Sequence, residues 1–349
     1  MAQSLNTGLK KITESLLLNA YTVEPAGFMH GKAGIALTLF ELNRYCSNES
    51  IENHAFDLLQ EVLAYDISER NFVNGTSGIA YVIHYLIKNG FLDADYMDLY
   101  REQHSNIINN IKSLKYEKEG DYYEYVNELF FINVLTDYIE EEDYCKSLEI
   151  LRDNICETLN EFYKKADLKT SVHFHKYAAK LLTVCNSVRI VNSYTDDFLY
   201  KIKKIQNKLN RQDCICEYPL YPIQLYMYGK LRNKRNVLED SKRMLETSME
   251  NIVIPSLDFR QKTDLIFNIY RLYAIDDMLD YSYVANKIFE TIMDEDVCAL
   301  EQKVYLNIFK NPTYTIDISS GISRLVLLNI YWERIRQGYF PGNIVELFN

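Results

Sequence analysis

Strongly apolar segments and more polar, amphipathic segments take turns along this chain. The apolar segments begin at seven positions: Phe28, Phe72, Asp121, His173, Glu217, Asp258 and Asp317. The stretches between them include IENHAFDLLQEVLAY and DFLYKIKKIQNKLN, which are typical of helices with one polar face. Alternation of buried and amphipathic helices is the pattern of stacked helical hairpins, in which neighbours enclose one helix of each pair. The pattern therefore predicts an all-α fold.

The first two apolar segments are copies of one unit. FMHGKAGIALTLFELNRYC from Phe28 and FVNGTSGIAYVIHYLIKNG from Phe72 align without a gap at an offset of 44 residues. Each copy carries a Gly-x-x-Gly-Ile-Ala turn that opens a strongly apolar helix. In a third copy, DISSGISRLVLLNIYWER, we expect Gly321 to match Gly34 and Ile318 to replace the first glycine. Repeats of about 20–50 residues indicate stacked supersecondary units.

The turn glycines allow two interpretations. They could form an anion site at a helix N-terminus, or they could permit close packing of successive helix starts where a side chain would not fit. A ligand loop rarely recurs in equivalent units, whereas a packing constraint recurs in all of them. The repetition therefore favours close packing.

Glycine and proline are scarce, with 12 and 6 among 349 residues, which favours long helices with short connections. No Gly/Ser/Pro-rich linker and no change of composition divides the chain, so we predict one domain over residues 1–349. Closing a helical array into a ring would hide both terminal units, which an open solenoid would have to cap.

The charge balance disfavours nucleic acid and anionic membranes as partners. Lys and Arg number 38 against 49 Asp and Glu, a net charge of −11, and the sequence shows no basic patch. No apolar run approaches the roughly 20 residues of a membrane span. The seven cysteines are scattered and odd in number, unlike a disulfide framework. We therefore expect a reduced, cytoplasmic protein without a membrane span.

The turn segments carry a resemblance to a known family. HGKAGIA from His30, NGTSGIA from Asn74 and the Gly321-Ile322 segment resemble the lanthionine synthetase C-like (LanC-like) family. The resemblance implies an α/α toroid of about seven inner and seven outer helices. It also implies a zinc enzyme whose metal holds a substrate Cys as thiolate, which adds to a dehydroalanine or dehydrobutyrine and closes a thioether ring. Zinc suits this chemistry because it stabilises a thiolate near neutral pH and keeps an open coordination position.

The zinc ligands that the resemblance implies do not match this sequence. The Cys of the fifth unit falls on Glu217, with Cys216 one place off, and the Cys-His of the sixth falls on Phe259 and Arg260. A phenyl ring and a guanidinium cannot ligate zinc. We therefore predict a divergent member with no metal ligands and no cofactor. A non-standard metal site of Cys214, Cys216 and a distant His is the alternative.

Two other positions keep the residue types of the family's site. Glu124 falls where the resemblance implies an Asp in the third unit, and His175 falls where it implies an acid/base His in the fourth. These two residues are our candidate catalytic groups. Glu128 shares a helix face with Glu124, but the carboxylates of a glycosidase flank the scissile bond from opposite sides. A solvated or cavity-facing pair is the better explanation.

Other candidate groups have simpler explanations. His30 beside a turn glycine is typical of local capping or packing. His173 and His175 would share a side in an extended segment and diverge in a helix, so a metal pair is the less favoured interpretation. The segment 276–277 holds two Asp without the acid-rich context of a Mg²⁺ site, and we expect surface charges there. Helix packing explains most of the 29 tyrosines, although Tyr also suits a wet or peptide-binding wall.

The resemblance to the LanC-like family implies a role in the maturation of a ribosomally synthesised peptide. The chain would bind the peptide or a partner modification enzyme at the mouth of the toroid, in thioether cyclisation or in a zinc-independent accessory role. The alternatives are a metal-free acid/base enzyme that uses Glu124 and His175, a carbohydrate-active α/α-toroid enzyme, and a non-catalytic scaffold.

Overall fold

A computed structural model of the chain describes residues 7–65, 67–116, 122–188, 190, 192–211, 218–297 and 316–336. These residues form helices and connecting turns and contain no strand, which confirms the all-α prediction. They fall into two compact units. Unit 1 comprises the described parts of 1–110 and 291–339, and unit 2 those of 111–290. In this part of the chain, no helix combines the length and the apolar character needed to cross a membrane.

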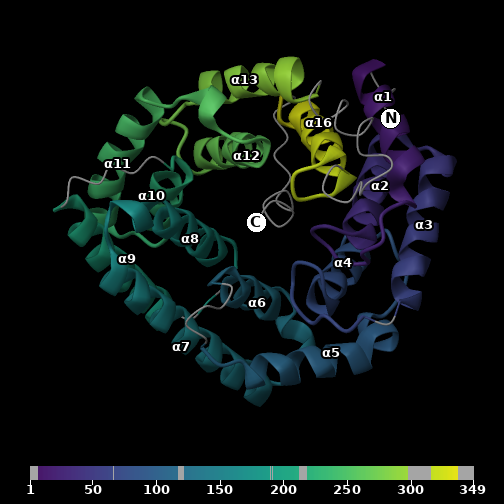
Figure 1. The fold of residues 1–349 in the computed structure, drawn as a ribbon, viewed down its shortest axis with the longest axis horizontal. Coiled ribbons are helices and arrows are strands. Elements are labelled where there is room, and N and C mark those ends of the chain that lie inside the picture. The colour runs from purple at the N-terminus through teal and green to yellow at the C-terminus, as the bar shows by residue number, and fades with distance from the viewer. Residues whose placement is uncertain are drawn as a thin grey trace. The chain divides into compact units, whose positions relative to one another are not determined.

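Unit 1 contains α1 (Thr7–Ala20), α2 (Lys32–Cys46), α3 (Glu49–Ala64), α4 (Thr76–Lys88), most of α5 (Tyr96–Ser113), the π-helical η3 (Ile292–Asp296) and α16 (Ile322–Arg336). The helices α16, α2 and α4 are successive neighbours, and α3 packs along α2 (Figure 1). Helix α2 is buried at every position from Lys32 to Leu42. Helix α3 buries only a stripe: Ile51, Ala55, Leu58, Leu59 and Val62. An enclosed helix and an amphipathic covering helix therefore alternate here, as the sequence pattern predicts.

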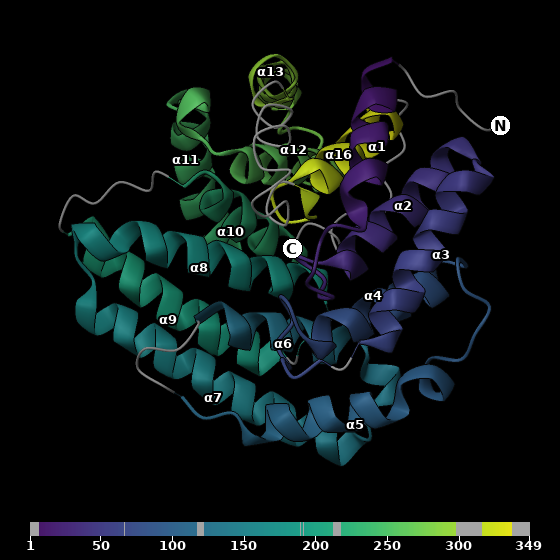
Figure 2. The ribbon, with the colours of Figure 1, turned by 45° about the vertical axis from the view of Figure 1, so that its right-hand side comes forward.

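Unit 2 contains α6 (Tyr122–Val134), η1 (Thr136–Tyr138), α7 (Glu141–Lys165), α8 (Leu168–Ser187), α9 (Asn192–Asn210), α10 (Leu220–Leu231), α11 (Arg235–Glu250), η2 (Ile254–Ser256), α12 (Phe259–Ile275) and α13 (Ser282–Thr291). The helices α6, α8, α10 and α12 follow one another as neighbours (Figure 1). The covering helices α7, α9 and α11 pack along them (Figure 2). Both units thus repeat one pairing scheme, and a closed toroid of about seven pairs, as one domain, stays a prediction.

Helix starts in the two units use different chemistry. Helices α2 and α4 begin after Gly31 and Gly75, which supply no side-chain cap. Helices α8 and α12 begin with capping boxes, in which the Asp167 and Asp258 carboxylates accept a backbone N–H of the first turn. Glycine is tolerated as an N-cap at a cost of only about a few tenths of a kcal/mol. The crowding at these positions indicates a packing constraint, because a side-chain carbon added at Gly31 would lie 2.5 Å from the Gly27 nitrogen and one added at Gly75 would lie 2.6 Å from the Asn71 nitrogen.

That constraint is the docking of one glycine turn on the next. A side-chain carbon added at Gly34 would lie 2.0 Å from the Phe28 carbonyl oxygen and 2.8 Å from Ile318 Cγ2. One added at Gly78 would lie 2.2 Å from the Phe72 carbonyl oxygen and 2.8 Å from Phe28 Cβ. Each turn therefore folds onto its own helix and contacts an apolar residue of the turn before it. These contacts confirm the close-packing interpretation of the glycines.

Backbone hydrogen bonds between the turns follow the same order. The Ser319 N–H donates to the Met29 carbonyl at 3.2 Å, and the Met29 N–H donates to the Val73 carbonyl at 2.8 Å. At Gly27, an added carbon would lie 2.4 Å from Asn74 Cα. The turn before α16, the turn before α2 and the turn before α4 are thus joined backbone to backbone.

The structure corrects the register of the third copy. Gly321 directly precedes α16, as the first turn glycine precedes α2 and α4, so it is equivalent to Gly31 and not to Gly34. Ile318 is then equivalent to Phe28, which explains why both contact a glycine of the following turn. The expectation that Ile318 replaces a glycine is wrong, because matching the Gly-Ile pair shifts the alignment away from the helix start.

The corrected register also places three buried polar residues at equivalent positions of the three copies. Glu41, Tyr85 and Tyr331 each lie ten residues after the first glycine of their turn. The Tyr85 hydroxyl donates to Glu41 Oε1 at 2.7 Å, and Arg44 Nη2 lies 3.4 Å from the same oxygen. Burial raises the pKa of Tyr85 and of Tyr331, so both hydroxyls stay protonated at neutral pH. This hydrogen bond holds α4 in register with α2.

We expect Gly34→Ala to destabilise the protein by about 1–3 kcal/mol, the usual cost of overpacking, because the new carbon would meet backbone atoms. Gly229→Ala is the matched control. Gly229 lies inside α10, a carbon added there would keep 3.1 Å from its nearest neighbours, and alanine favours a helix by up to about 1 kcal/mol. Urea denaturation measures both variants, and equal free energies of unfolding would contradict the turn-docking constraint.

Candidate functional site

His175, a candidate catalytic group, lies in α8 with 1% of its surface exposed. Its Nε2 lies 2.9 Å from Gln206 Oε1 of α9, and its ring centroid lies 5.1 Å from that of Tyr221 in α10. Burial lowers the pKa of His175, and the hydrogen bond with Gln206 opposes the shift. The imidazole is therefore neutral near pH 7 and enclosed by three helices.

Glu124, the other candidate, lies in the first turn of α6 and is partly exposed. Glu128, one turn further along, is buried at 1% exposure, so the two carboxylates do not share a solvated face. Within the described residues, the contacts of His175 are with Phe174, Gln206 and Tyr221 and do not include Glu124. The structure thus separates the two candidates by environment, one in the core and one at a helix start.

The remaining histidine candidates occupy structural positions. His173 and His175 lie on one helix and diverge, since His173 is exposed and His175 is buried. This confirms the helical alternative over a metal pair. His30 Nδ1 lies 2.6 Å from Asp317 Oδ2, so His30 links the turn before α2 to the turn before α16. Its role is packing between repeats.

The expectation of surface charges at 276–277 is wrong for Asp276. Asp276 is 9% exposed, and its Oδ2 accepts hydrogen bonds from Lys230 Nζ at 2.8 Å and from the Tyr226 hydroxyl at 2.7 Å. These hydrogen bonds, led by that from Lys230, lower the pKa of the Asp276 carboxyl. The pair ties the end of α12 to α10. Asp277 is exposed, as expected.

The positions implied for zinc ligands hold other chemistry. Phe259 and Arg260 begin α12, where Arg260 Nε lies 4.0 Å from Asp264 Oδ2. The segment 214–217, with Cys214, Cys216 and Glu217, lies outside the described residues. Elsewhere in the described chain, no three His, Cys, Asp or Glu side chains are grouped so that they could hold a metal ion.

Tyr218, just before α10, is the centre of a group that sequence reasoning did not single out. Lys176 Nζ of α8 lies 5.9 Å from the centroid of its ring. Burial raises the pKa of Tyr218, the Asp264 carboxylate raises it further, and the Arg260 guanidinium opposes the shift. Tyr123 of α6 adds a smaller effect in the raising direction. Four neighbouring helices therefore bring side chains to one place.

The ring of Tyr123 lies 6.0 Å from that of Tyr177 in α8, which extends the group. We define the helix-start cluster by its members: Tyr123, Lys176, Tyr177, Tyr218, Arg260 and Asp264. Glu124 follows Tyr123 directly on α6. The members come from the starts of α6, α10 and α12 and from the middle of α8, so the cluster becomes visible only once the packing order of these helices is known.

The cluster combines rigid aromatic rings with charges of both signs. Because the pKa of Tyr218 and Tyr177 is raised by burial, their hydroxyls stay protonated at neutral pH. Tyr123 and Tyr218 are partly exposed, so their rings offer apolar contact at a low entropic cost, whereas Tyr177 is buried and packs against Tyr123. Lys176 and Arg260 can bind carboxylates or carbonyl oxygens. This arrangement suits the binding of a polypeptide segment.

A comparison with protein-family models gave no match, and a comparison with curated proteins gave none either. The resemblance to the LanC-like family therefore rests on the glycine-turn segments and stays a prediction.

Protein stability should fall as the pH drops from about 7 toward about 5, and His175 should account for part of the slope. The pKa of His175 is lowered in the folded protein, so below about pH 6.5 the unfolded chain takes up a proton that the folded chain resists. This contribution is absent above that pH and grows as the pH approaches the folded pKa. His175→Gln should flatten the dependence of the urea midpoint on pH.

His173→Gln is the control for this measurement, because it removes an exposed histidine from the same helix. Its pH dependence should match that of the parent protein. A slope unchanged by His175→Gln would show that the burial of His175 does not govern its ionisation.

Proposed function

We propose that this chain acts in the maturation of a ribosomally synthesised peptide, by binding the peptide or a partner modification enzyme through the helix-start cluster. The observation that carries the proposal is the convergence of Tyr123, Lys176 and Tyr218 from three neighbouring enclosed helices. The resemblance to the LanC-like family implies reactive residues in these same units, at Glu124, at Glu217 and at 259–260.

A zinc-independent role is the form of this function that the residues support. Phe259 and Arg260 carry no atom that can ligate zinc, so the sixth unit cannot supply the metal ligands of an active family member. Arg260 instead contributes a cation that is 48% exposed and lies near the Asp264 carboxylate. Recognition of a peptide replaces activation of its thiol in this proposal.

Peptide binding also fits the balance of groups in the cluster. Two cations, Lys176 and Arg260, and two carboxylates, Asp264 and Asp258, lie around Tyr218. The cluster therefore offers charges of both signs, which suits a peptide segment that carries both acidic and basic groups.

We expect Lys176→Glu to weaken binding of a small Cys- and Ser/Thr-rich precursor peptide by about tenfold, because a charge reversal removes an attraction to the carboxylates of the peptide and adds a repulsion. Fluorescence anisotropy of the labelled peptide with the full-length chain measures the change. Lys169→Glu makes the same charge change in the first turn of α8, at an exposed residue outside the cluster, and should alter affinity by less than about twofold.

Two further results would overturn parts of this proposal. Stoichiometric zinc in the purified protein, measured by elemental analysis, would contradict the zinc-independent role. Failure of the parent protein to bind either a precursor peptide of this kind or a peptide-modifying enzyme would contradict the function itself.

A further inference from the structure

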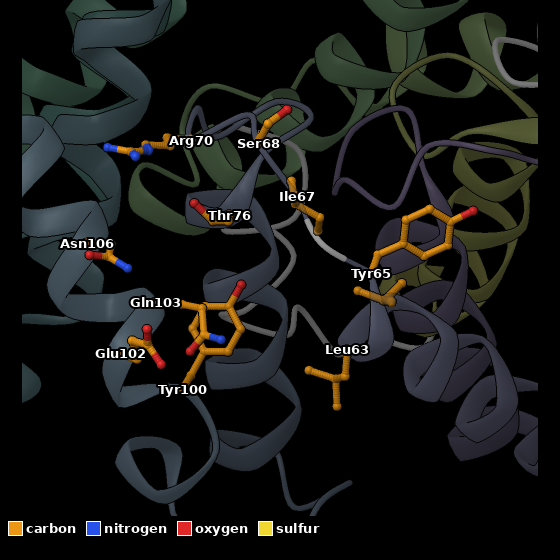
Figure 3. A pocket seen from close by; sticks show the side chains of 11 residues that line it. Leu63, Tyr65, Ile67, Ser68, Arg70, Thr76, Tyr100, Glu102, Gln103 and Asn106 are labelled. Atoms are coloured by element: carbon orange, nitrogen blue, oxygen red, sulfur yellow. The ribbon is translucent and has the colours of Figure 1, made fainter.

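Unit 1 holds a polar cavity of about 440 Å³ beside the enclosed helices. Its walls are the end of α3, the loop that leads to α4, the first residue of α4, and the first half of α5 (Figure 3). A volume of this size lies within the range of small-molecule sites, about 300–1,000 Å³. The cavity lies in unit 1, whereas the helix-start cluster lies in unit 2. The cavity therefore has no part in the proposed function.

The cavity has two unlike sides. Leu63, Tyr65 and Ile67 form an apolar side, and Arg70 and Glu102 lie with Asn106 on the other (Figure 3). Thr76, Tyr100 and Gln103 lie between them (Figure 3). A guanidinium and a carboxylate thus line one side of a cavity whose opposite side offers aliphatic and aromatic contact.

The backbone that carries these side chains is held in place. Ser77 Oγ donates to the Arg70 carbonyl at 2.7 Å, and the Thr76 N–H donates to the Glu69 carbonyl at 3.1 Å. Across the cavity, α5 departs from helical backbone at Tyr100, whose side chain is largely buried with 5% of the residue exposed. The backbone of both walls is therefore defined before any ligand binds, so that only the exposed side chains must be ordered on binding.

The charged and amide groups of the cavity are not engaged with each other. Among the described residues, no hydrogen bond or ion pair joins the side chains of Arg70, Glu102, Gln103 and Asn106 to a partner. Arg70 and Glu102 present opposite charges without neutralising each other. A ligand that satisfies both must carry a carboxylate for the guanidinium and an ammonium for the carboxylate.

We propose that this cavity binds a small zwitterion with an apolar side chain, namely an aliphatic α-amino acid, free or as part of a short peptide. The ligand carboxylate binds Arg70, the ammonium binds Glu102, and the side chain packs against Leu63, Tyr65 and Ile67. The carboxamides of Gln103 and Asn106 are placed to bind the peptide group of a dipeptide.

Titration calorimetry of the full-length protein with leucine, leucylglycine, N-acetylleucine and leucinamide tests the proposal. We expect leucine or leucylglycine to bind, and the tighter of the two identifies the source as a free amino acid or a peptide. N-acetylleucine lacks the ammonium and leucinamide lacks the carboxylate, so each should bind at least about tenfold more weakly than leucine. Absence of binding of both leucine and leucylglycine at about 10 mM would overturn the proposal.

Variants assign each charge to its group on the ligand. Glu102→Gln should weaken leucine binding about tenfold and leave N-acetylleucine binding unchanged, while Arg70→Gln should weaken leucine binding and leave leucinamide binding unchanged. Both residues are exposed, so neither variant should unfold the protein. Arg101→Gln is the control, because Arg101 is exposed on α5 next to Glu102 and lies outside the cavity. Equal affinities in all three variants would contradict the assigned contacts.

Discussion

A backbone carbonyl, that of Phe28 or Phe72, occupies the space beside the second turn glycine of α2 and of α4, about where a side-chain carbon would stand. Unit 1 depends on this contact. Because the turn folds onto the first turn of its own helix, an apolar residue of the preceding turn can reach the same glycine, and α16, α2 and α4 are held in a fixed order. In α16 the corresponding position is Arg324, which is buried at 3% exposure. The third copy therefore has an arginine side chain where the other two have a glycine.

Unit 2 achieves the same succession of enclosed helices without the glycines. Side chains join its neighbours: Asn186 Nδ2 of α8 donates to Gln224 Oε1 of α10 at 3.0 Å, and Arg271 Nη2 of α12 donates to the Asn186 carbonyl at 2.8 Å. Burial lowers the pKa of Arg271 to about 10, which still leaves it charged at neutral pH. Where unit 1 joins helix starts through backbone, unit 2 presents tyrosine and arginine side chains at the starts of α6, α10 and α12, and Lys176 reaches Tyr218 from the middle of α8. The proposed function uses those side chains.

The candidate site was only partly predictable from the sequence. Glu124 lies in the first turn of α6, within the apolar segment that the sequence pattern predicts to be a helix. His175 was selected by its position in the fourth unit, but burial depends on which helices flank α8, and Gln206 and Tyr221 come from later parts of the chain. No sequence motif marks Tyr218. Its significance comes from Lys176 and from residues of α12, which approach it only in the folded protein.

What the amino-acid sequence determined by itself was the all-α fold, the alternation of enclosed and covering helices, and the packing role of the turn glycines. These follow from the local density of apolar residues and from the lack of a side chain at glycine, and both can be read from short segments of the sequence. Only the tertiary structure decided the register of the third copy, the burial of Asp276 and His175, and the meeting of the helix-start cluster. Each of these depends on which helix faces another, and the residues that decide it are distant along the chain.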